Sequence, residues 1–277
     1  MTAFAFDHVA IAVRRWDVAG PVLAGVLGGR WGHGAHLPHM SVCQVHYGND
    51  TRVELLAPGT SPDSFVRTFL DRGQGASRPH HLTFRVSDIG KTLAAASAHG
   101  VEPVLVDLSH ELRKEAFLHP RDTGLGFLVQ FVESSLDMAE IAALSDVPAP
   151  WDDPADGPPA RLDCVLAEVP DLTTQRTVLA DILGGTEEDL PTPSGRRAAR
   201  FTWAEGADVV LVEEPGLPRA RHGVRSLGVT TDRPLPFATA PAGGGHVETS
   251  VIPELGLSLM TRPAPATGSP RSPRSAR

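Results

Sequence analysis

Cysteine and lysine are nearly absent from this 277-residue sequence, whose 25 basic residues include only two lysines, Lys91 and Lys114. The two cysteines, Cys43 and Cys164, are too few for a disulfide framework or a cysteine-rich zinc cluster, and they favour a reduced, cytoplasmic protein. The basic residues are scattered and the net charge is −8, so no basic stripe indicates nucleic-acid binding.

Long apolar runs are also missing, since none approaches the roughly 20 residues that span a bilayer. The first residues, MTAFAFDHVAIAV, lack a basic leader and a small-residue cleavage site, and they alternate as a strand does. We therefore expect a cytoplasmic protein that acts on a small-molecule substrate, with no membrane or nucleic-acid partner. Whether two chains pair as a homodimer is left open.

Changes in composition divide the chain into four parts. Residues 134–160 are rich in proline and acidic residues and are interpreted as a linker, with at most a short helix around 136–144. Residues 263–277 have almost nothing to bury and are expected to be a disordered tail. Residues 1–133 and 161–262 remain, and each is long enough to form a core.

Internal repetition is the most informative feature of the sequence. Residues 6–29, FDHVAIAVRRWDVAGPVLAGVLGG, align without a gap to residues 162–185, LDCVLAEVPDLTTQRTVLADILGG, and both end in a glycine pair that can close a helix. Within the first copy, DHVAIAV (7–13) matches HHLTFRV (80–86). The chain is thus interpreted as four units of one strand, one helix and up to three strands, which predicts an α+β fold of mixed sheets with helices on one side.

Strand alternation selects two histidines. Side chains of a strand point alternately to opposite faces, so His8 shares its face with Ala10 and Ala12, which leave room beside it. The repeat aligns His81, and not His80, with His8. His80 is expected on the opposite face, packed against a helix.

Each half of the first copy also has an oxygen donor on a later strand. Glu54 lies in TRVELLAP and Gln130 in GFLVQFVE, at matching places of the two units. A lone charge in such a strand is costly unless it is paired or bound to a metal. Two imidazoles and one carboxylate, with a glutamine oxygen as a weaker fourth ligand, suit one divalent ion such as Zn, Co, Ni, Mn or Fe. We predict metal ligands at His8, Glu54, His81 and Gln130.

Three further polar residues are candidate substrate-binding groups. Arg52 and Arg85 share the predicted site face and could hold a substrate carboxylate or phosphate, or could neutralise Glu54. His46 lies on the strand before the Glu54 strand, on one face with Gln44, and could contact the substrate or act as a base.

The remaining histidines are given structural interpretations. His33, His36 and His39 recur every three residues in WGHGAHLPHM, and a solvated loop is favoured there over a second metal site or a pocket rim. His119, in FLHP, is expected to shape a turn.

Four separated segments of the first copy carry a family resemblance: FDHVAIAV, TRVELLAPGTSPDSFVRTFLDRGQG, HHLTFRVSDI and AFLHPRDTGLGFLVQFVE. Over about residues 5–133 they resemble the vicinal oxygen chelate superfamily, most closely its methylmalonyl-CoA epimerase and glyoxalase I branch. The resemblance implies paired βαβββ units that form a cupped sheet around one divalent metal, with ligands at His8, Glu54, His81 and Gln130. It also implies that the metal stabilises an enolate or enediolate while a base moves a proton.

The order of the two oxygen ligands is reversed relative to the epimerases of this branch. There the last ligand is a glutamate that transfers a proton, whereas this chain has Gln130, which cannot titrate. Glu54 is the remaining carboxylate of the set. We therefore expect Glu54 to be the catalytic base as well as a ligand.

The second copy is predicted to have lost the site. Alignment of the two copies puts other residues at the four ligand positions: Cys164 at His8, Leu211 at Glu54, Arg225 or Ser226 at His81, and Leu259 or Met260 at Gln130. No metal is expected in residues 161–262, a degenerate module that would support the first.

These observations favour a metal-dependent lyase or isomerase that acts on a small oxygenated acid or CoA thioester through a stabilised enolate. A non-haem iron dioxygenase is the first alternative, because His8, His81 and Glu54 make a two-histidine, one-carboxylate set. A non-catalytic small-molecule binding or resistance protein is the second.

Overall fold

The computed structural model describes residues 4–136, 140, 147–152, 158–192, 195–218, 221–243 and 246–263. The first module comprises β1 (Phe4–Ala12), α1 (Trp16–Gly20), the π-helix η1 (Pro21–Val26), β2 (Arg30–His36), β3 (Met40–His46), β4 (Arg52–Pro58), α2 (Phe65–Arg72), β5 (Arg78–Val86), α3 (Ile89–Ala98), β6 (Pro103–Asp107), β7 (Arg113–Leu118), α4 (Pro120–Thr123) and β8 (Leu128–Ser134). The second module comprises β9 (Arg161–Val169), α6 (Thr173–Arg176), the π-helix η2 (Thr177–Ile182), β10 (Thr186–Leu190), β11 (Ala198–Thr202), β12 (Asp208–Glu213), β13 (Gly223–Thr230), β14 (Thr239–Gly243), β15 (His246–Thr249) and β16 (Ser258–Arg262).

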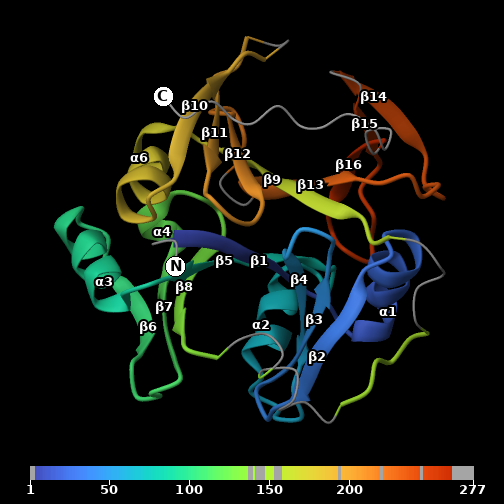
Figure 1. Ribbon diagram of the computed structural model, residues 1–277, viewed down its shortest axis with the longest axis horizontal. Coiled ribbons are helices and arrows are strands. Elements are labelled where there is room, and N and C mark those ends of the chain that lie inside the picture. Colours follow the sequence, from blue (N-terminus) through green and yellow to red (C-terminus); the bar gives the residue numbers. More distant parts are fainter. Residues whose placement is uncertain are drawn as a thin grey trace.

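Each module forms one mixed, eight-stranded sheet (Figure 1). The strand orders are β2-β3-β4-β1-β5-β8-β7-β6 and β10-β11-β12-β9-β13-β16-β15-β14, so the two sheets have the same topology. In each, the two central strands run antiparallel, and each pairs in parallel with the last strand of its own unit. The predicted α+β fold of two tandem modules is confirmed.

Three of the four units contain the helix that the repeat predicts, and the fourth does not. Residues 231–238, which connect β13 to β14, form no helix. Their sequence, TDRPLPFA, contains two prolines, each of which removes a backbone donor and disfavours a helical residue before it. The expectation of one helix in every unit is therefore wrong for the last unit.

The helix ends follow the sequence signals. Gly28 and Gly184, from the two repeated glycine pairs, have φ angles of 68° and 63° after η1 and η2. This left-handed conformation suits glycine at the end of a helix. Asp88 caps α3 by accepting a hydrogen bond from the backbone N–H of Lys91, and Gly100, with φ 73°, follows its end. These turns direct the chain back into the sheet after each helix.

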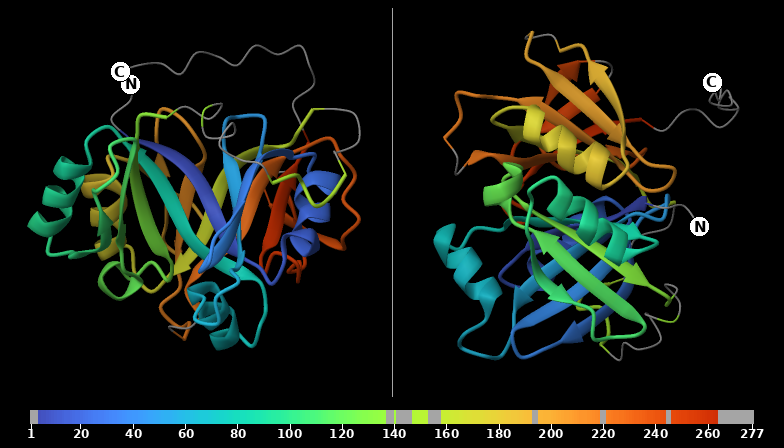
Figure 2. Two further views of the ribbon diagram at one scale, coloured as in Figure 1. Left: turned by 90° about the horizontal axis from the view of Figure 1, so that it is seen from below. Right: turned by 90° about the vertical axis from the view of Figure 1, so that its left-hand side faces the viewer.

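One apolar core joins the two modules. Phe6 and Phe84 of the first module and Phe201 of the second belong to a single buried cluster, and the rings of Phe84 and Trp203 lie 4.8 Å apart. Figure 2 shows α3 and α6 side by side between the two sheets. Asn49 ties the turn between β3 and β4 to β9 through two hydrogen bonds with the backbone of Leu162. The two modules thus pack against each other through a shared core.

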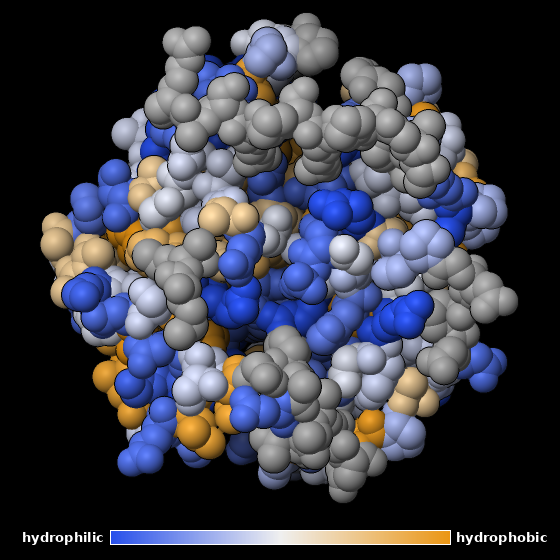
Figure 3. Space-filling view, in the orientation of Figure 1, coloured by the Kyte–Doolittle hydropathy of each residue, from blue (hydrophilic) through white to orange (hydrophobic). Residues whose placement is uncertain are grey.

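The opposite face of the first sheet carries the predicted ligands. Ala10, Ala12 and Leu56 lie there in a smaller apolar cluster with Val66 and Leu70 of α2, which covers part of this face. Figure 3 shows hydrophilic side chains around a hollow near the middle of the molecule.

Parts of the predicted linker and tail cannot be compared with the structure. Most of the anticipated helix around 136–144, and residues 264–277 of the expected tail, lie outside the described residues. In the described part of the linker, Trp151 packs its ring 5.3 Å from that of Trp31. No described helix is long and apolar enough to cross a membrane.

Candidate metal centre

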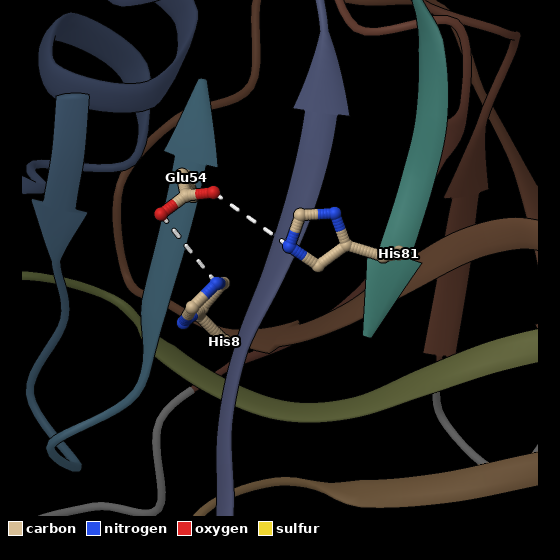
Figure 4. A group of neighbouring side chains, drawn as sticks. All are labelled: His8, Glu54 and His81. Carbon is tan, nitrogen blue, oxygen red and sulfur yellow. Dashed lines mark ion pairs between the residues drawn. The ribbon is translucent and has the colours of Figure 1, made fainter. Parts of the chain in front are cut away.

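Three predicted ligands meet on the site face of the first sheet (Figure 4). His8 comes from β1, Glu54 from β4 and His81 from β5, and one donor atom of each lies within 4.8 Å of the others. His8 Nε2 is 3.5 Å from Glu54 Oε2, and His81 Nε2 is 3.7 Å from Glu54 Oε1. The register explains this convergence, because Ala10 of β1 pairs with Glu54 on one side and with His81 on the other.

These distances suit a metal ion. Ligand atoms about 2.0–2.2 Å from a tetrahedral ion lie roughly 3.3–3.6 Å from one another. Among the residues that the structure describes, this is the only group of three or more imidazole, thiol and carboxylate side chains close enough to hold one.

Two β-bulges orient the imidazoles. The pairing of β1 with β5 skips Asp7 and His80, the residues just before the two histidine ligands. A bulge re-aims the side chains next to it, so the simple alternation of faces fails there. Asp7 Oδ2 accepts a hydrogen bond from His8 Nδ1 at 2.7 Å, and His80 Nδ1 is 2.8 Å from His81 Nδ1.

The expectation for His80 therefore needs a correction. His80 does pack against a helix, with its ring 4.6 Å from that of Phe69 in α2. That helix, however, covers the site face, and His80 lies beside His81 instead of on the opposite side of the sheet. The extra residue of the bulge causes the difference.

Both histidines have the arrangement expected of metal ligands. Their Nδ1 atoms are held by Asp7 and His80, which leaves each Nε2 directed toward Glu54. Outer partners of this kind fix the orientation of metal-bound histidines. Burial, together with the charges of His80 and His8, lowers the pKa of His81 well below 6.5 and so favours the neutral imidazole that binds metals. His81 Nε2 is buried and has no hydrogen-bond partner among the described residues.

Gln130 lies next to the three ligands. Its amide oxygen accepts a hydrogen bond of 2.6 Å from Thr83 Oγ1, which is also 2.9 Å from His8 Nε2. Its amide nitrogen donates to Glu115 Oε2 at 2.8 Å. Sequence reasoning missed Glu115, whose strand was recognised but whose position beside Gln130 depends on the register of β7 with β8. Glu115 is two residues from Phe117, which pairs with Gln130, so strand alternation puts Glu115 on the same face as Gln130.

The two candidate substrate-binding arginines both pair with Asp7. Arg52 forms a buried ion pair with this carboxylate. Arg85 Nε lies 3.2 Å from the same carboxylate, and Arg85 Nη2 lies 3.1 Å from Glu205 of the second module. Burial alone would raise the pKa of Asp7, but the hydrogen bond with His8 and the two arginine charges hold it well below its usual range. Asp7 is therefore an anion that orients His8.

Gln44 and His46 extend the polar face along β3. Gln44 Nε2 donates to Glu54 Oε2 at 3.0 Å and so fixes the carboxylate. His46 pairs with Arg52 in the register, and burial, reinforced by Arg52 and His33, lowers its pKa from 6.5 to about 4. His46 thus lies two residue pairs from Glu54 along the strands.

The loop expected for the repeated histidines is mostly a strand. His33 and His36 belong to β2, which pairs with β3, because the edge of the sheet supplies partners for its backbone. His36 stacks on Trp16 with ring centroids 4.7 Å apart, and His39 lies 3.6 Å from Asp63, so the structure does not bring the three together. His119 shapes a turn as expected, since its Nδ1 accepts from the backbone N–H of Arg121.

The second sheet shows which residues replace the ligands. Register equivalence gives Cys164 at His8, Val210 at Glu54, Ser226 at His81 and Met260 at Gln130. The alignment of Leu211 with Glu54 is therefore wrong by one residue. Leu211 is fully buried in the core, on the other face of its strand.

Comparison with known proteins agrees with this architecture. Residues 7–117 match the Glyoxalase/Bleomycin resistance protein/Dioxygenase superfamily. The first module is thus a domain of this superfamily, also called the vicinal oxygen chelate superfamily. No curated protein matches the sequence.

Solved structures reproduce the tandem fold. A variant of 4-hydroxymandelate synthase from Streptomyces coelicolor is 14% identical, with a TM-score of 0.61, and the match covers 94% of this chain and 92% of that one. A hypothetical protein from Staphylococcus aureus is 9% identical, with a TM-score of 0.61 and coverage of 94% and 100%. Methylmalonyl-CoA epimerase from Mycobacterium tuberculosis is 28% identical over 49% of this chain and 91% of its own, with a TM-score of 0.43.

Proposed function

We propose that this protein is a metal-dependent lyase or isomerase that acts on a small oxygenated acid or CoA thioester through a stabilised enolate. The observation that carries the proposal is the convergence of His8 Nε2, His81 Nε2 and the Glu54 carboxylate in a nearly buried site. We assign catalysis to residues 1–133 and a supporting role to residues 161–262. Cys43 and Cys164 are both free, in keeping with the cytoplasmic location that we propose.

The proposed ligands are His8, Glu54 and His81, with the oxygen of Gln130 as a weaker fourth. A divalent ion held by these residues would supply Lewis-acid chemistry toward two adjacent substrate oxygens. The chain itself supplies orientation. Asp7 and His80 hold the imidazoles, and Gln44 holds the carboxylate of Glu54.

Glu54 is the proposed base, because it is the carboxylate at the centre of the site. Its side chain is 12% exposed, so a substrate that enters the site would meet it away from bulk water. Glu115 is the nearest alternative. It reaches the centre only through Gln130, and its side chain is 28% exposed.

The test combines metal analysis with hydrogen exchange. We expect a stoichiometric divalent metal in protein purified without added ions. We also expect the metal-loaded protein to exchange a hydrogen on the carbon next to a carbonyl group, in methylmalonyl-CoA or in a small 2-hydroxy or 2-oxo acid, with deuterium from D2O, observed by NMR. Glu54→Gln should abolish the exchange and Glu115→Gln should retain it. Exchange that survives in Glu54→Gln but not in Glu115→Gln would transfer the role of base to Glu115.

A non-haem iron dioxygenase is the second candidate, favoured by the donor set itself. Two histidines and one carboxylate are the ligand pattern of many iron oxygenases. Stoichiometric iron and substrate-dependent oxygen uptake, without α-hydrogen exchange, would support this function. Binding of a small molecule without turnover by either measure would instead support a binding or resistance protein.

A further inference from the structure

A cavity of about 250 Å³ lies over the second sheet. Its lining includes Cys164, Arg200, Asp208, Gly228, Met260 and Arg262. The strand register matches four of its positions to the first module's centre: Cys164 to His8, Asp208 to Arg52, Gly228 to Thr83 and Met260 to Gln130. The cavity therefore lies beside the counterparts of His8 and Gln130, whereas Val210 and Ser226, the counterparts of Glu54 and His81, are not among its lining residues.

Small residues keep this space open. Glycine stands at the position of Thr83 and cysteine at that of His8, so both hydrogen-bonding side chains are missing. A Cβ atom at Gly228 would lie 2.4 Å from Cys164 Sγ, which is closer than two such atoms can approach. Among the described residues, no three metal-binding side chains come close enough here to hold an ion.

The cavity keeps a hydrogen-bond donor whose acceptor has been replaced. In the first module, Gln44 donates to the carboxylate of its strand partner Glu54. In the second, the corresponding pair is Arg200 and Val210, so a guanidinium faces a side chain that cannot accept. Arg200 Nε is buried and has no hydrogen-bond partner in the part of the chain that the structure describes. A carboxylate from outside would take the place that Glu54 has in the first module.

The charges around the cavity also favour an anion. Three arginines line it, and Asp163 and Asp208 are the two carboxylates among the lining residues. The ion pairs are long: Arg200 Nε is 3.8 Å from Asp208 and its Nη1 is 3.7 Å from Glu188, and Asp163 lies 3.4 Å from Arg262 and 3.8 Å from Arg161. Arg262 Nε donates a hydrogen bond of 2.9 Å to Thr230 Oγ1. Guanidinium N–H groups thus remain available for the paired hydrogen bonds that carboxylates accept.

We propose that the second module binds a small carboxylic acid in this cavity, with Arg200 as the main hydrogen-bond donor to the acid's carboxylate. The volume lies below the roughly 300–1,000 Å³ of pockets for drug-sized ligands, which limits the ligand to an acid of a few carbons. Arg161 and Arg262 supply the surrounding positive charge. This site is distinct from the metal centre and does not depend on the function proposed for it.

The experiment uses Met260 as a reporter. The sequence has four methionines, so the full chain labelled with [methyl-¹³C]methionine gives few resonances, and Met260→Leu assigns the one that lines the cavity. Metal-stripped protein is titrated with malonate, succinate and glutarate, and with the uncharged malonamide as the control ligand. We expect a saturable shift of the Met260 resonance with at least one acid and none with malonamide.

Two variants and one control make the result decisive. Arg200→Gln should lower the affinity for the acid about 10- to 100-fold, because a charge-assisted hydrogen bond is lost. Arg262→Gln, also on the cavity wall, should weaken binding less, and Arg15→Gln, an exposed residue just before α1 that does not line the cavity, should leave binding unchanged. Both cavity arginines are partly exposed, so the variants are expected to fold.

The proposal is overturned if no acid shifts Met260 saturably at millimolar concentration. It is equally overturned if malonamide binds as well as malonate, or if folded Arg200→Gln binds the acid as tightly as the unaltered chain. A Met260 shift that requires the first module's metal would mean that the acid binds at the metal centre, and would also overturn it.

Discussion

The two modules have the same sheet topology but different side chains on the equivalent face. Each central strand pair skips one aspartate, Asp7 in β1 and Asp163 in β9, at the same place in the register. In the first module this aspartate orients a histidine, whereas in the second it accepts a hydrogen bond from Thr230 and lies beside Arg262. The bulge thus belongs to the fold, and a handful of side chains next to it determine what the face can bind.

The difference also concerns the cost of burying charged groups in each sheet. The replacements on the second sheet are small or apolar, and Val210 packs with Ala198 and Val212 in a minor cluster of its own. A carboxylate left there without its histidines would be costly to bury. The second sheet has none of the three ligands and avoids that cost, and a cavity borders the counterparts of His8 and Gln130.

The largest expected effect separates the two modules by metal content. His81→Ala removes one of three strong ligands, so the metal affinity should fall by more than the roughly 10–100-fold that an outer partner is worth. Metal analysis after gel filtration would then find little bound ion. Ser226→Ala, the matched change in the second module, should keep the full stoichiometry. Equal metal loss in both variants would refute the assignment of the centre to the first module.

The next effect tests what the modules share. Leu55 and Leu211 follow the equivalent positions Glu54 and Val210, and both are fully buried in the common core. Leu55→Ala and Leu211→Ala should each lower the free energy of unfolding by about 2–5 kcal/mol in urea titrations. Val210→Ala should lower the free energy of unfolding by about 1.5 kcal/mol, because Val210 lies in the minor cluster and the change removes two buried methyl groups. A Val210 cost as large as that of Leu211 would contradict the placement of Val210 outside the common core.

Much of this comparison could be predicted from the sequence. The repeat paired His8 with His81 and identified Cys164 as the replacement, because aligned strands conserve the positions that face one another. Leu211 was misplaced by one residue, since an alignment with loops of different length does not fix which face a strand residue takes. The strand register settles that question in favour of Val210.

Other features depend on distant parts of the chain. The bulge at His80 breaks the alternation rule, and it forms only where β5 pairs with β1. Glu115 reaches Gln130 through the register of β7 with β8, which its own sequence does not reveal. The strand at His33 likewise needs β3 as a partner, so a glycine-rich stretch was interpreted as a loop.

A smaller effect concerns the two bulge aspartates. Asp7→Asn keeps the shape of the side chain but weakens the hydrogen bond that orients His8, so metal affinity should fall about 10–100-fold. Competition with a chelator measures the change. Asp163→Asn is the matched control and should leave the affinity at the first centre unaltered. If Asp7→Asn also leaves the metal affinity unchanged, the Asp7 carboxylate pairs with the arginines but does not orient His8 for metal binding.

The smallest expected effect is an acid sensitivity confined to the first module. His46 has a pKa of about 4 in the folded chain against 6.5 for an ordinary histidine, chiefly because it is buried, whereas β11 of the second sheet contains no histidine. Between these values the unfolded chain takes up a proton that the folded chain does not, so stability is complete above about pH 6.5 and declines toward pH 4. After allowance for its partial exposure, the loss should be about 1–2 kcal/mol. Urea titrations of metal-free protein at pH 7 and pH 4.5 should show a smaller difference for His46→Gln, while the exposed His99→Gln should behave as the unaltered chain does. An unchanged pH dependence in His46→Gln would mean that the imidazole is protonated in the folded chain, and that its burial against Arg52 does not exclude the charge.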